Sequence, residues 1–160
     1  MKYNITMFAY NESENIQASI KSVWRNADSD LGTFHLIANG CTDDTVAKAQ
    51  EMKSSLLFDK LSITELVVGD KCNAWNYYMH ELADDIDIHF FVDADVSFSA
   101  CCFQKMASTL YSSQPETVAI AGLPLSGRNQ AFYKSLVVER SCLFGNLYGL
   151  KNTFIKHIRK

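Results

Sequence analysis

The sequence predicts a three-layer α/β/α domain whose central sheet is mostly parallel. Short runs rich in β-branched and aromatic residues alternate with stretches whose apolar residues recur at helical spacing. Parallel strands need crossover connections, and helices in that role cover both faces of a sheet. A length of 160 residues suits one domain with a core of its own. We therefore expect residues 1–160 to fold as a single domain.

Each predicted strand is an apolar run that ends at turn or capping residues. The strands are expected at residues 3–9, 33–38, 61–68, 87–92 and 117–123. A helix is expected after each strand, with Thr42 as the N-cap of the second helix and residues 131–147 in the last. The first four helices each show an apolar face, formed by Ile16, Ile20 and Val23; Val46, Ala49 and Met52; Trp75, Tyr78 and Met79; and Phe103, Met106 and Leu110.

The composition argues against several classes of protein. A net charge of −3 gives no general basis for binding nucleic acid, so none is expected as a partner. Five cysteines without a C-x-x-C pair argue against a disulfide framework and a structural zinc site. Reduced thiols are typical of the cytoplasm, and no apolar stretch approaches the length that spans a bilayer. We therefore expect a cytoplasmic protein.

Polar segments follow four of the predicted strands, at residues 10–12, 39–43, 69–71 and 93–95. In a parallel α/β sheet, the carboxyl ends of the strands share the edge where ligands bind. All four segments are therefore expected to face that edge.

Asp93 and Asp95 form the most informative pair at this edge. They follow an apolar run and are separated by one small residue. Residues two apart in a strand point to the same side, so the two carboxylates can converge, and they repel unless a cation lies between them. Carboxylate oxygens suit Mg²⁺ or Mn²⁺. Turn chemistry is the alternative, because Asp is common where strands stop, but the shared edge favours a metal site.

The same four segments carry sequence motifs. Residues 7–12 read MFAYNE, residues 39–45 read NGCTDDT, residues 69–76 read GDKCNAWN and residues 91–95 read FVDAD. In this order they resemble the P-A-Y-N-E, D-G-S-x-D-x-T, G-K-x-x-A-x-N and D-x-D motifs of family-two glycosyltransferases of the GT-A type. The chain is similar to the N-terminal, nucleotide-sugar-binding portion of such enzymes.

The resemblance implies a GT-A fold and a nucleotide-diphosphate sugar as donor. Asp95, together with Asp93, would coordinate the Mg²⁺ or Mn²⁺ that bridges the diphosphate. The sugar would pass with inversion to a hydroxyl of a saccharide or lipid-linked acceptor. The residues that the resemblance assigns to the nucleotide are Ala9, Tyr10, Asn11, Glu12, Asn39, Lys71 and Asp93.

The sequence departs from the family where catalysis is concerned. Family members carry an acidic catalytic base downstream of D-x-D, whereas the D-D pairs at 43–44 and 84–85 lie upstream of it. Glu139 follows without a motif, so no catalytic base is identified. We therefore expect that the chain lacks the C-terminal acceptor part. Asn39 stands where relatives carry an acid, which leaves the base preference open.

Other interpretations stay open. A catalytically incomplete fragment that binds nucleotides or self-associates would explain the missing base. A nucleotidyltransferase is less favoured, because residues 10–13 are neither glycine-rich nor basic. A homo-oligomer, peripheral membrane contact, and membrane association through missing segments are further alternatives. The basic residues within 151–160 could approach such a surface.

Overall fold

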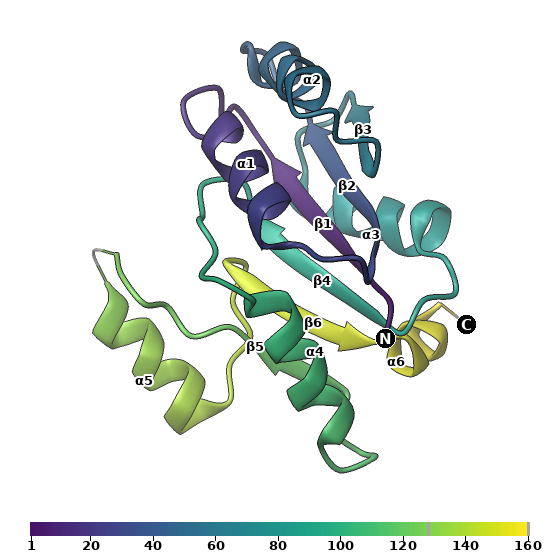
Figure 1. Ribbon diagram of the computed structural model, residues 1–160, viewed down its shortest axis with the longest axis vertical. Helices are drawn as coiled ribbons and strands as arrows, with labels where there is room; N and C mark the ends of the chain where they lie inside the picture. Colours follow the sequence, from purple (N-terminus) through teal and green to yellow (C-terminus); the bar gives the residue numbers. More distant parts are fainter. Residues whose placement is uncertain (128, 160) are drawn as a thin grey trace.

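The computed structural model describes residues 1–127 and 129–159. Within these residues, six strands form one sheet in the order β3-β2-β1-β4-β6-β5 (Figure 1). β1 pairs in parallel with β2 and β4, and β2 with β3, whereas β6 runs antiparallel to β4 and β5. The mostly parallel sheet is thus confirmed. The strands are β1 Tyr3–Ala9, β2 Leu31–Asn39, β3 Leu61–Leu66, β4 Ile88–Asp93, β5 Ala119–Ala121 and β6 Leu147–Lys151.

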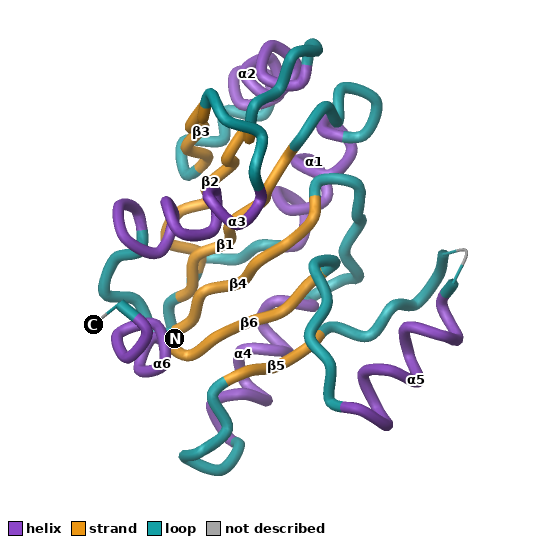
Figure 2. The backbone as a smooth tube through the Cα atoms, turned by 180° about the vertical axis from the view of Figure 1, so that it is seen from behind, coloured by secondary structure: helices purple, strands orange, loops and turns teal. Residues whose placement is uncertain are grey.

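Helices cover both faces of the sheet, as the alternating pattern predicts (Figure 2). Residues of α1, α2 and α4 pack on one face, and residues of α3, the π-helix η1 and α6 pack on the other. The helices are α1 Ile16–Asn26, α2 Thr45–Ser55, α3 Lys71–Tyr77, η1 Tyr78–Leu82, α4 Cys102–Ser112, α5 Gln130–Arg140 and α6 Asn152–Ile158.

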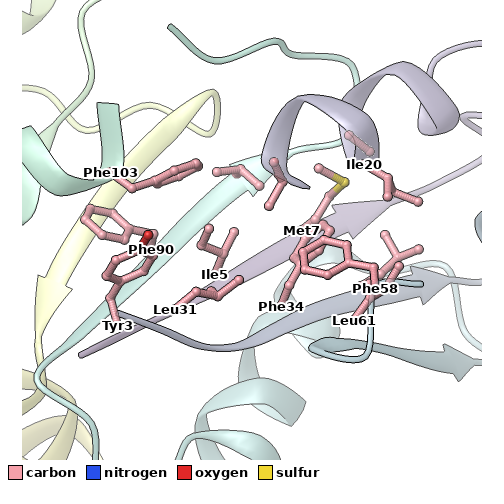
Figure 3. Close-up of a cluster of buried hydrophobic side chains, with 14 of the residues drawn as sticks. Tyr3, Ile5, Met7, Ile20, Leu31, Phe34, Phe58, Leu61, Phe90 and Phe103 are labelled. Carbon is pink, nitrogen blue, oxygen red and sulfur yellow. The ribbon is translucent and has the colours of Figure 1, made fainter. Parts of the chain in front are cut away.

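The two faces follow from the two-residue period of the strands. On the first face, Ile5 and Met7 of β1 and Phe90 of β4 join an apolar cluster that includes Phe103 of α4 (Figure 3). On the second face, Phe8 and Phe91 meet a smaller cluster from α3, η1 and α6. Because both faces of β1 and β4 are buried, these strands are fixed in register and their carboxyl ends are firmly placed.

The second face also holds buried polar side chains. His89 lies between the Tyr78 hydroxyl, 2.6 Å from Nδ1, and the side-chain oxygen of Asn152, 3.2 Å from Nε2. Neither ring nitrogen of the buried His35 has a hydrogen-bond partner within the described chain, and the same is true of the Thr6 hydroxyl. Burial lowers the pKa of both histidines, because it disfavours the charged imidazolium.

The last helix predicted from the sequence is wrong beyond residue 140. α5 ends at Arg140, and Ser141 adopts a left-handed conformation with φ of 51°. The chain then forms β6, where Gly149 packs so closely on Phe90 that a Cβ would lie 2.7 Å from the ring. Residues 141–146 thus form a loop between α5 and β6 in place of the last turns of the predicted helix. The predicted N-cap Thr42 is also wrong, because α2 begins at Thr45 and Asp44 precedes it.

α5 stands apart from the sheet in both views (Figures 1 and 2). None of its residues is buried. Across the described residues, no helix has both the length and the apolar character needed to cross a bilayer.

Candidate functional site

The carboxyl ends of β1, β2, β3 and β4 lie at one edge of the sheet, because these strands run parallel. The four polar segments predicted from the sequence follow these strands, so the structure brings them together. Hydrogen bonds between side chains and backbone join the first three of these loops, and the Lys71–Asp93 ion pair links the third to the end of β4.

The loop after β1 is tied to the loop after β2. The Asn11 side-chain oxygen accepts a hydrogen bond from the Thr42 backbone N–H (2.8 Å), and the Asn11 backbone N–H donates to Cys41 Sγ (3.4 Å). Asn11 adopts a left-handed conformation with φ of 53°, which Asn tolerates better than most residues. The Glu12 backbone N–H donates to the Thr45 hydroxyl (2.8 Å). These contacts fix the backbone around Tyr10.

Two predicted residues of this loop have side chains that are buried or already engaged. Ala9 is buried, and its carbonyl oxygen accepts a hydrogen bond from the Cys41 thiol (3.4 Å). The Glu12 carboxylate accepts from the Asn15 side chain (2.9 Å) at the start of α1. Ala9 can therefore contribute only backbone and shape, and Glu12 is oriented by α1.

The Asp43 side chain joins the loops after β1 and β2, although it is not among the site residues predicted from the sequence. Its carboxylate accepts hydrogen bonds from the Thr45 hydroxyl and from the backbone N–H groups of Thr45 and Ser13. The Thr45 hydroxyl has the largest effect, and together these donors lower the pKa of Asp43 to about 2. The ionised Asp43 carboxylate thus has a structural role, because its hydrogen bonds hold the two loops together.

Asn39 links the end of β2 to the loop after β3. Its side-chain oxygen accepts a hydrogen bond from the Asp70 backbone N–H (3.0 Å). The Asp70 carboxylate in turn caps α3 by accepting from the backbone N–H groups of Cys72 (2.8 Å) and Asn73 (3.3 Å). The oxygen of Asn39 that a nucleobase could use therefore already positions α3 and, with it, Lys71.

Tyr10 and two glycines form a shallow platform beside Asn39. Gly40 has φ of +68°, and a Cβ there would lie 2.5 Å from the Gly69 backbone nitrogen. A Cβ at Gly69 would lie 3.0 Å from the Tyr10 ring. Since 58% of Tyr10 is exposed, its ring offers a free aromatic surface above this close backbone contact.

Asp93 lies at the end of β4 and is held from two sides. Its Oδ1 forms an ion pair with Lys71 Nζ at 2.5 Å. On the other side, the backbone of Gly145 approaches so closely that a Cβ there would lie 2.6 Å from Asp93 Oδ2. The sequence predicted Lys71 and Asp93 but missed Gly145. Because Gly145 falls within the helix expected over residues 131–147, no pattern in the sequence indicates that it approaches Asp93.

Asp95 follows the strand and is exposed. It forms no ion pair with any described residue, and it lines a cavity of about 650 Å³. Within the described chain, no group of three His, Cys, Asp or Glu side chains could hold a metal ion unaided. The assignment of Asp93 and Asp95 as metal ligands therefore stays a prediction, and a cation bound there would need further ligands.

Solved structures share this arrangement of strands and helices. A mannosyltransferase from Pyrobaculum calidifontis, solved with GDP-Man and Mn²⁺, matches with a TM-score of 0.80 and 19% identity over 98% of this chain and 46% of that one. Glucosyl-3-phosphoglycerate synthase from Mycobacterium tuberculosis, solved with Mn²⁺, UDP and phosphoglyceric acid, matches with a TM-score of 0.67 and 17% identity over 95% of this chain and 56% of that one. The chain thus spans about half the length of these proteins.

These likenesses show that the fold is the GT-A fold of nucleotide-diphospho-sugar transferases. No curated protein matches the sequence. The family described as "Glycosyl transferase family 2" matches residues 5–154, which is nearly the whole chain and includes all four strand-end segments. The chain therefore belongs to glycosyl transferase family 2.

Proposed function

We propose that this chain binds a nucleotide-diphosphate sugar and takes part in transferring the sugar, with inversion, to an acceptor hydroxyl. The observation that carries the proposal is the convergence of four strand ends on one edge, with Asp93 and Asp95 among them, in a member of glycosyl transferase family 2. We also infer that residues 1–160 act as one donor-binding domain.

The base and ribose of the donor would lie on the platform formed by Tyr10, Gly40 and Gly69. The exposed Tyr10 ring can stack on a base. Asn11 and Glu12 would border the ribose, since their loop is fixed against the end of β2. Asn39 would act mainly by holding Asp70 and α3 in place.

A divalent cation fits Asp93 and Asp95, because two carboxylates at one strand end supply hard oxygen ligands and concentrate negative charge. Diphosphate oxygens and water would complete the coordination of Mg²⁺ or Mn²⁺, as is usual where protein carboxylates are few. When bound, the cation would neutralise the charge of the departing nucleoside diphosphate. The Mn²⁺ in both similar structures supports this choice of metal.

Lys71 would contribute a second positive charge. Its ammonium group pairs with Asp93, and its side chain is 57% exposed, so it can turn toward a phosphate without leaving a buried charge behind. Lys71 would therefore hold the diphosphate near the point where Asp93 and Asp95 meet.

A calorimetric titration with UDP and GDP, with and without Mn²⁺, tests the proposal. We expect metal-dependent binding that weakens at least about tenfold in Asp95→Asn, because a neutral amide is a poorer ligand for a hard cation. Asp59→Asn is the matched control, since Asp59 is exposed and precedes β3 at the opposite end of the strand. Binding that ignores the metal and survives Asp95→Asn would contradict the site.

A second measurement separates an enzyme from a binding module. If the chain is a transferase, it should release nucleoside diphosphate from a sugar nucleotide when Mn²⁺ is present, and Asp95→Asn should abolish the release. Metal-dependent binding without release would instead favour the catalytically incomplete alternative.

A further inference from the structure

Asn39 is a buried amide at the carboxyl end of β2, and the protein uses only one side of it. The residue is 4% exposed. It follows Ile37 by two residues, so its side chain points to the same face of the sheet as Ile37, the face that α3 covers. The Asn39 side chain therefore lies beside the platform formed by Tyr10 and the two glycines, next to the start of α3.

The orientation of the Asn39 amide is fixed by its partner. The Asp70 backbone nitrogen lies 3.0 Å from the amide and can only donate, so the atom that faces it has to be the oxygen, Oδ1. A rotated amide would set two donors against each other and leave the Asp70 N–H without an acceptor. The two N–H groups of Asn39 Nδ2 therefore point away from Asp70.

Asn39 Nδ2 has no hydrogen-bond partner among the residues that the structure describes, yet it is not sealed inside the chain. The described polar side-chain atoms that are both fully buried and unpartnered belong to Thr6, His35 and Gln104. Nδ2 is not one of them, so it reaches the surface from a side chain that is otherwise buried. Such a donor is held in place by packing and remains available to a ligand.

Side-chain oxygens of the neighbouring loops are already engaged. Asn11 Oδ1 accepts from a backbone N–H of the loop after β2, and the Asp70 carboxylate accepts from two backbone N–H groups of α3. A Cβ at Gly69 would lie 3.0 Å from the Tyr10 ring and 3.5 Å from the Asn39 backbone oxygen, so the ring and Asn39 border the same glycine. A base stacked on Tyr10 would therefore meet a hydrogen-bond donor at Asn39.

The common nucleobases differ in what they present to such a donor. On the edge that is used in base pairing, uracil and guanine carry a ring N–H, whereas cytosine and adenine carry a ring nitrogen with a free lone pair. An N–H of Asn39 can donate to that lone pair. Against a ring N–H it would repel, and the ring N–H would lose a partner. A site built around one hydrogen-bonding pattern rejects a ligand that cannot complete it.

We propose that Asn39 selects the nucleobase of the donor, and that this base carries an acceptor ring nitrogen on its pairing edge, as cytosine and adenine do. The inference rests on the proposed function, because that function places the base on the platform beside Asn39. Tyr10 would hold the plane of the base, and Asn39 Nδ2 would donate to its ring nitrogen. An acid in place of Asn39 would present an acceptor instead and would favour uracil or guanine.

Calorimetric titration of the unmodified chain with CDP, ADP, UDP and GDP, each with Mn²⁺, tests this selectivity. The four ligands share the diphosphate that the metal and Lys71 would bind, so differences in their affinity report on the base. We expect CDP or ADP to bind at least about fivefold more tightly than both UDP and GDP. The comparison of CDP with ADP tells which of the two bases fits. UDP or GDP binding as tightly as the better of CDP and ADP would overturn the proposal.

Deaza analogues, in which C–H replaces the acceptor ring nitrogen, test the contact itself. The deaza analogue of the preferred nucleotide keeps the shape and the stacking surface of the base but lacks the acceptor. It should bind at least about fivefold more weakly than the parent nucleotide. Equal affinity for the two would show that the ring nitrogen makes no contact with a donor.

Asn39→Asp should reverse the preference. One carboxylate oxygen can keep the hydrogen bond from the Asp70 N–H, while the other presents an acceptor where Nδ2 was, so UDP or GDP should now bind more tightly than CDP and ADP. Asn129→Asp is the matched control, because it makes the same change at an exposed residue just before α5 and should leave the preference as it is. A preference that survives Asn39→Asp would show that another group selects the base.

The same titrations distinguish this inference from the proposed function. If all four nucleoside diphosphates bind with equal, metal-dependent affinity, donor binding stands and only the selection by Asn39 is wrong. If none of them binds in the presence of Mn²⁺, the proposed function is wrong and the inference fails with it. The comparison in the unmodified chain decides between these outcomes even if Asn39→Asp does not fold.

Discussion

Lys71 and Asp93 form an ion pair across the candidate site, with Lys71 Nζ 2.5 Å from Asp93 Oδ1. The pair joins the first residue of α3 to the last residue of β4. Both side chains are partly exposed, so the pair contributes little to stability. In the proposed site the pair would matter electrostatically: Lys71 would balance the Asp93 carboxylate until a cation took that place, and its ammonium group would then become available to a diphosphate.

Replacing Lys71 by Met should therefore affect binding more than folding. We expect the affinity for nucleoside diphosphate with Mn²⁺ to fall about tenfold, because a charge-assisted contact is lost. The free energy of unfolding should change by less than about 1 kcal/mol. Calorimetry and urea denaturation of the same variant measure both quantities. Unchanged affinity would remove Lys71 from the site.

Gly145→Ala should disturb the site through Asp93. The new Cβ would lie 2.6 Å from Asp93 Oδ2, so either the carboxylate or the Gly145 backbone has to move. We expect at least about tenfold weaker Mn²⁺-dependent nucleotide binding, since displacement of a ligand by an ångström is costly. Calorimetry measures the effect.

The control for Gly145→Ala is Gly149→Ala, which makes the same change four residues later. There the Cβ would meet the buried Phe90 ring instead of Asp93. This variant should lose thermal stability by overpacking, while the folded fraction binds normally. If both variants bind as the unmodified chain does, Gly145 has no positioning role.

Asn39→Ala should loosen the loop that carries Lys71. The Asp70 backbone N–H loses its acceptor, so we expect the free energy of unfolding to fall by about 1 kcal/mol and nucleotide affinity to fall with it. Asn39→Asp keeps an acceptor oxygen at that place and should retain more stability than the alanine variant. Urea denaturation compares the two. Equal stability in both would show that the hydrogen bond is dispensable.

Because two histidines are buried, we expect the free energy of unfolding to fall in acid. The pKa of His35 and His89 is lowered in the folded chain, mainly by burial. As the pH falls from 7 to 5, the unfolded chain binds protons that the folded chain does not, so the free energy of unfolding falls. The limiting slope is about 1.4 kcal/mol per pH unit for each histidine.

His35→Leu should reduce this slope to about half, measured by urea denaturation across that pH range. Stability at pH 7 should be kept, because neither ring nitrogen of His35 has a described partner to lose. His89→Leu is the contrasting variant, since it leaves the Tyr78 hydroxyl and the Asn152 amide without their partner and should destabilise the chain at every pH. An unchanged slope in His35→Leu would contradict the lowered pKa of His35 in the folded chain.

The first four strands and their polar ends could be predicted from the sequence because local signals agree with the fold there. Apolar runs end at residues that favour turns and caps, and parallel pairing then brings the ends to one edge. The place of Tyr10, Asn39, Lys71 and Asp93 at this edge was predicted in this way, whereas their roles toward a nucleotide come from the motif resemblance and stay predictions. The hydrogen bond from the Asp70 backbone N–H to the Asn39 side-chain oxygen was not predictable, because it joins loops 31 residues apart.

The last third of the chain was less predictable because long-range contacts decide its structure. The helix predicted over residues 131–147 ends at Arg140, and residues 147–151 form a strand that pairs with β4 and β5. The close approach of Gly145 to Asp93 depends on that pairing. The hydrogen bond between the buried side chains of His89 and Tyr78 likewise depends on the packing of η1 against the second face of the sheet. No local sequence pattern indicates that packing.

The position of β6 between β4 and β5 has a consequence for synthesis of the protein. Residues 1–95 can assemble β3, β2, β1 and β4 while the ribosome is still adding later residues, but one edge of β4 stays unpaired until residues 147–151 emerge. An unpaired edge beside Phe90 and Phe91 is prone to association with other chains. A nascent chain that stalls between α4 and β6 should therefore be the most aggregation-prone intermediate of this protein.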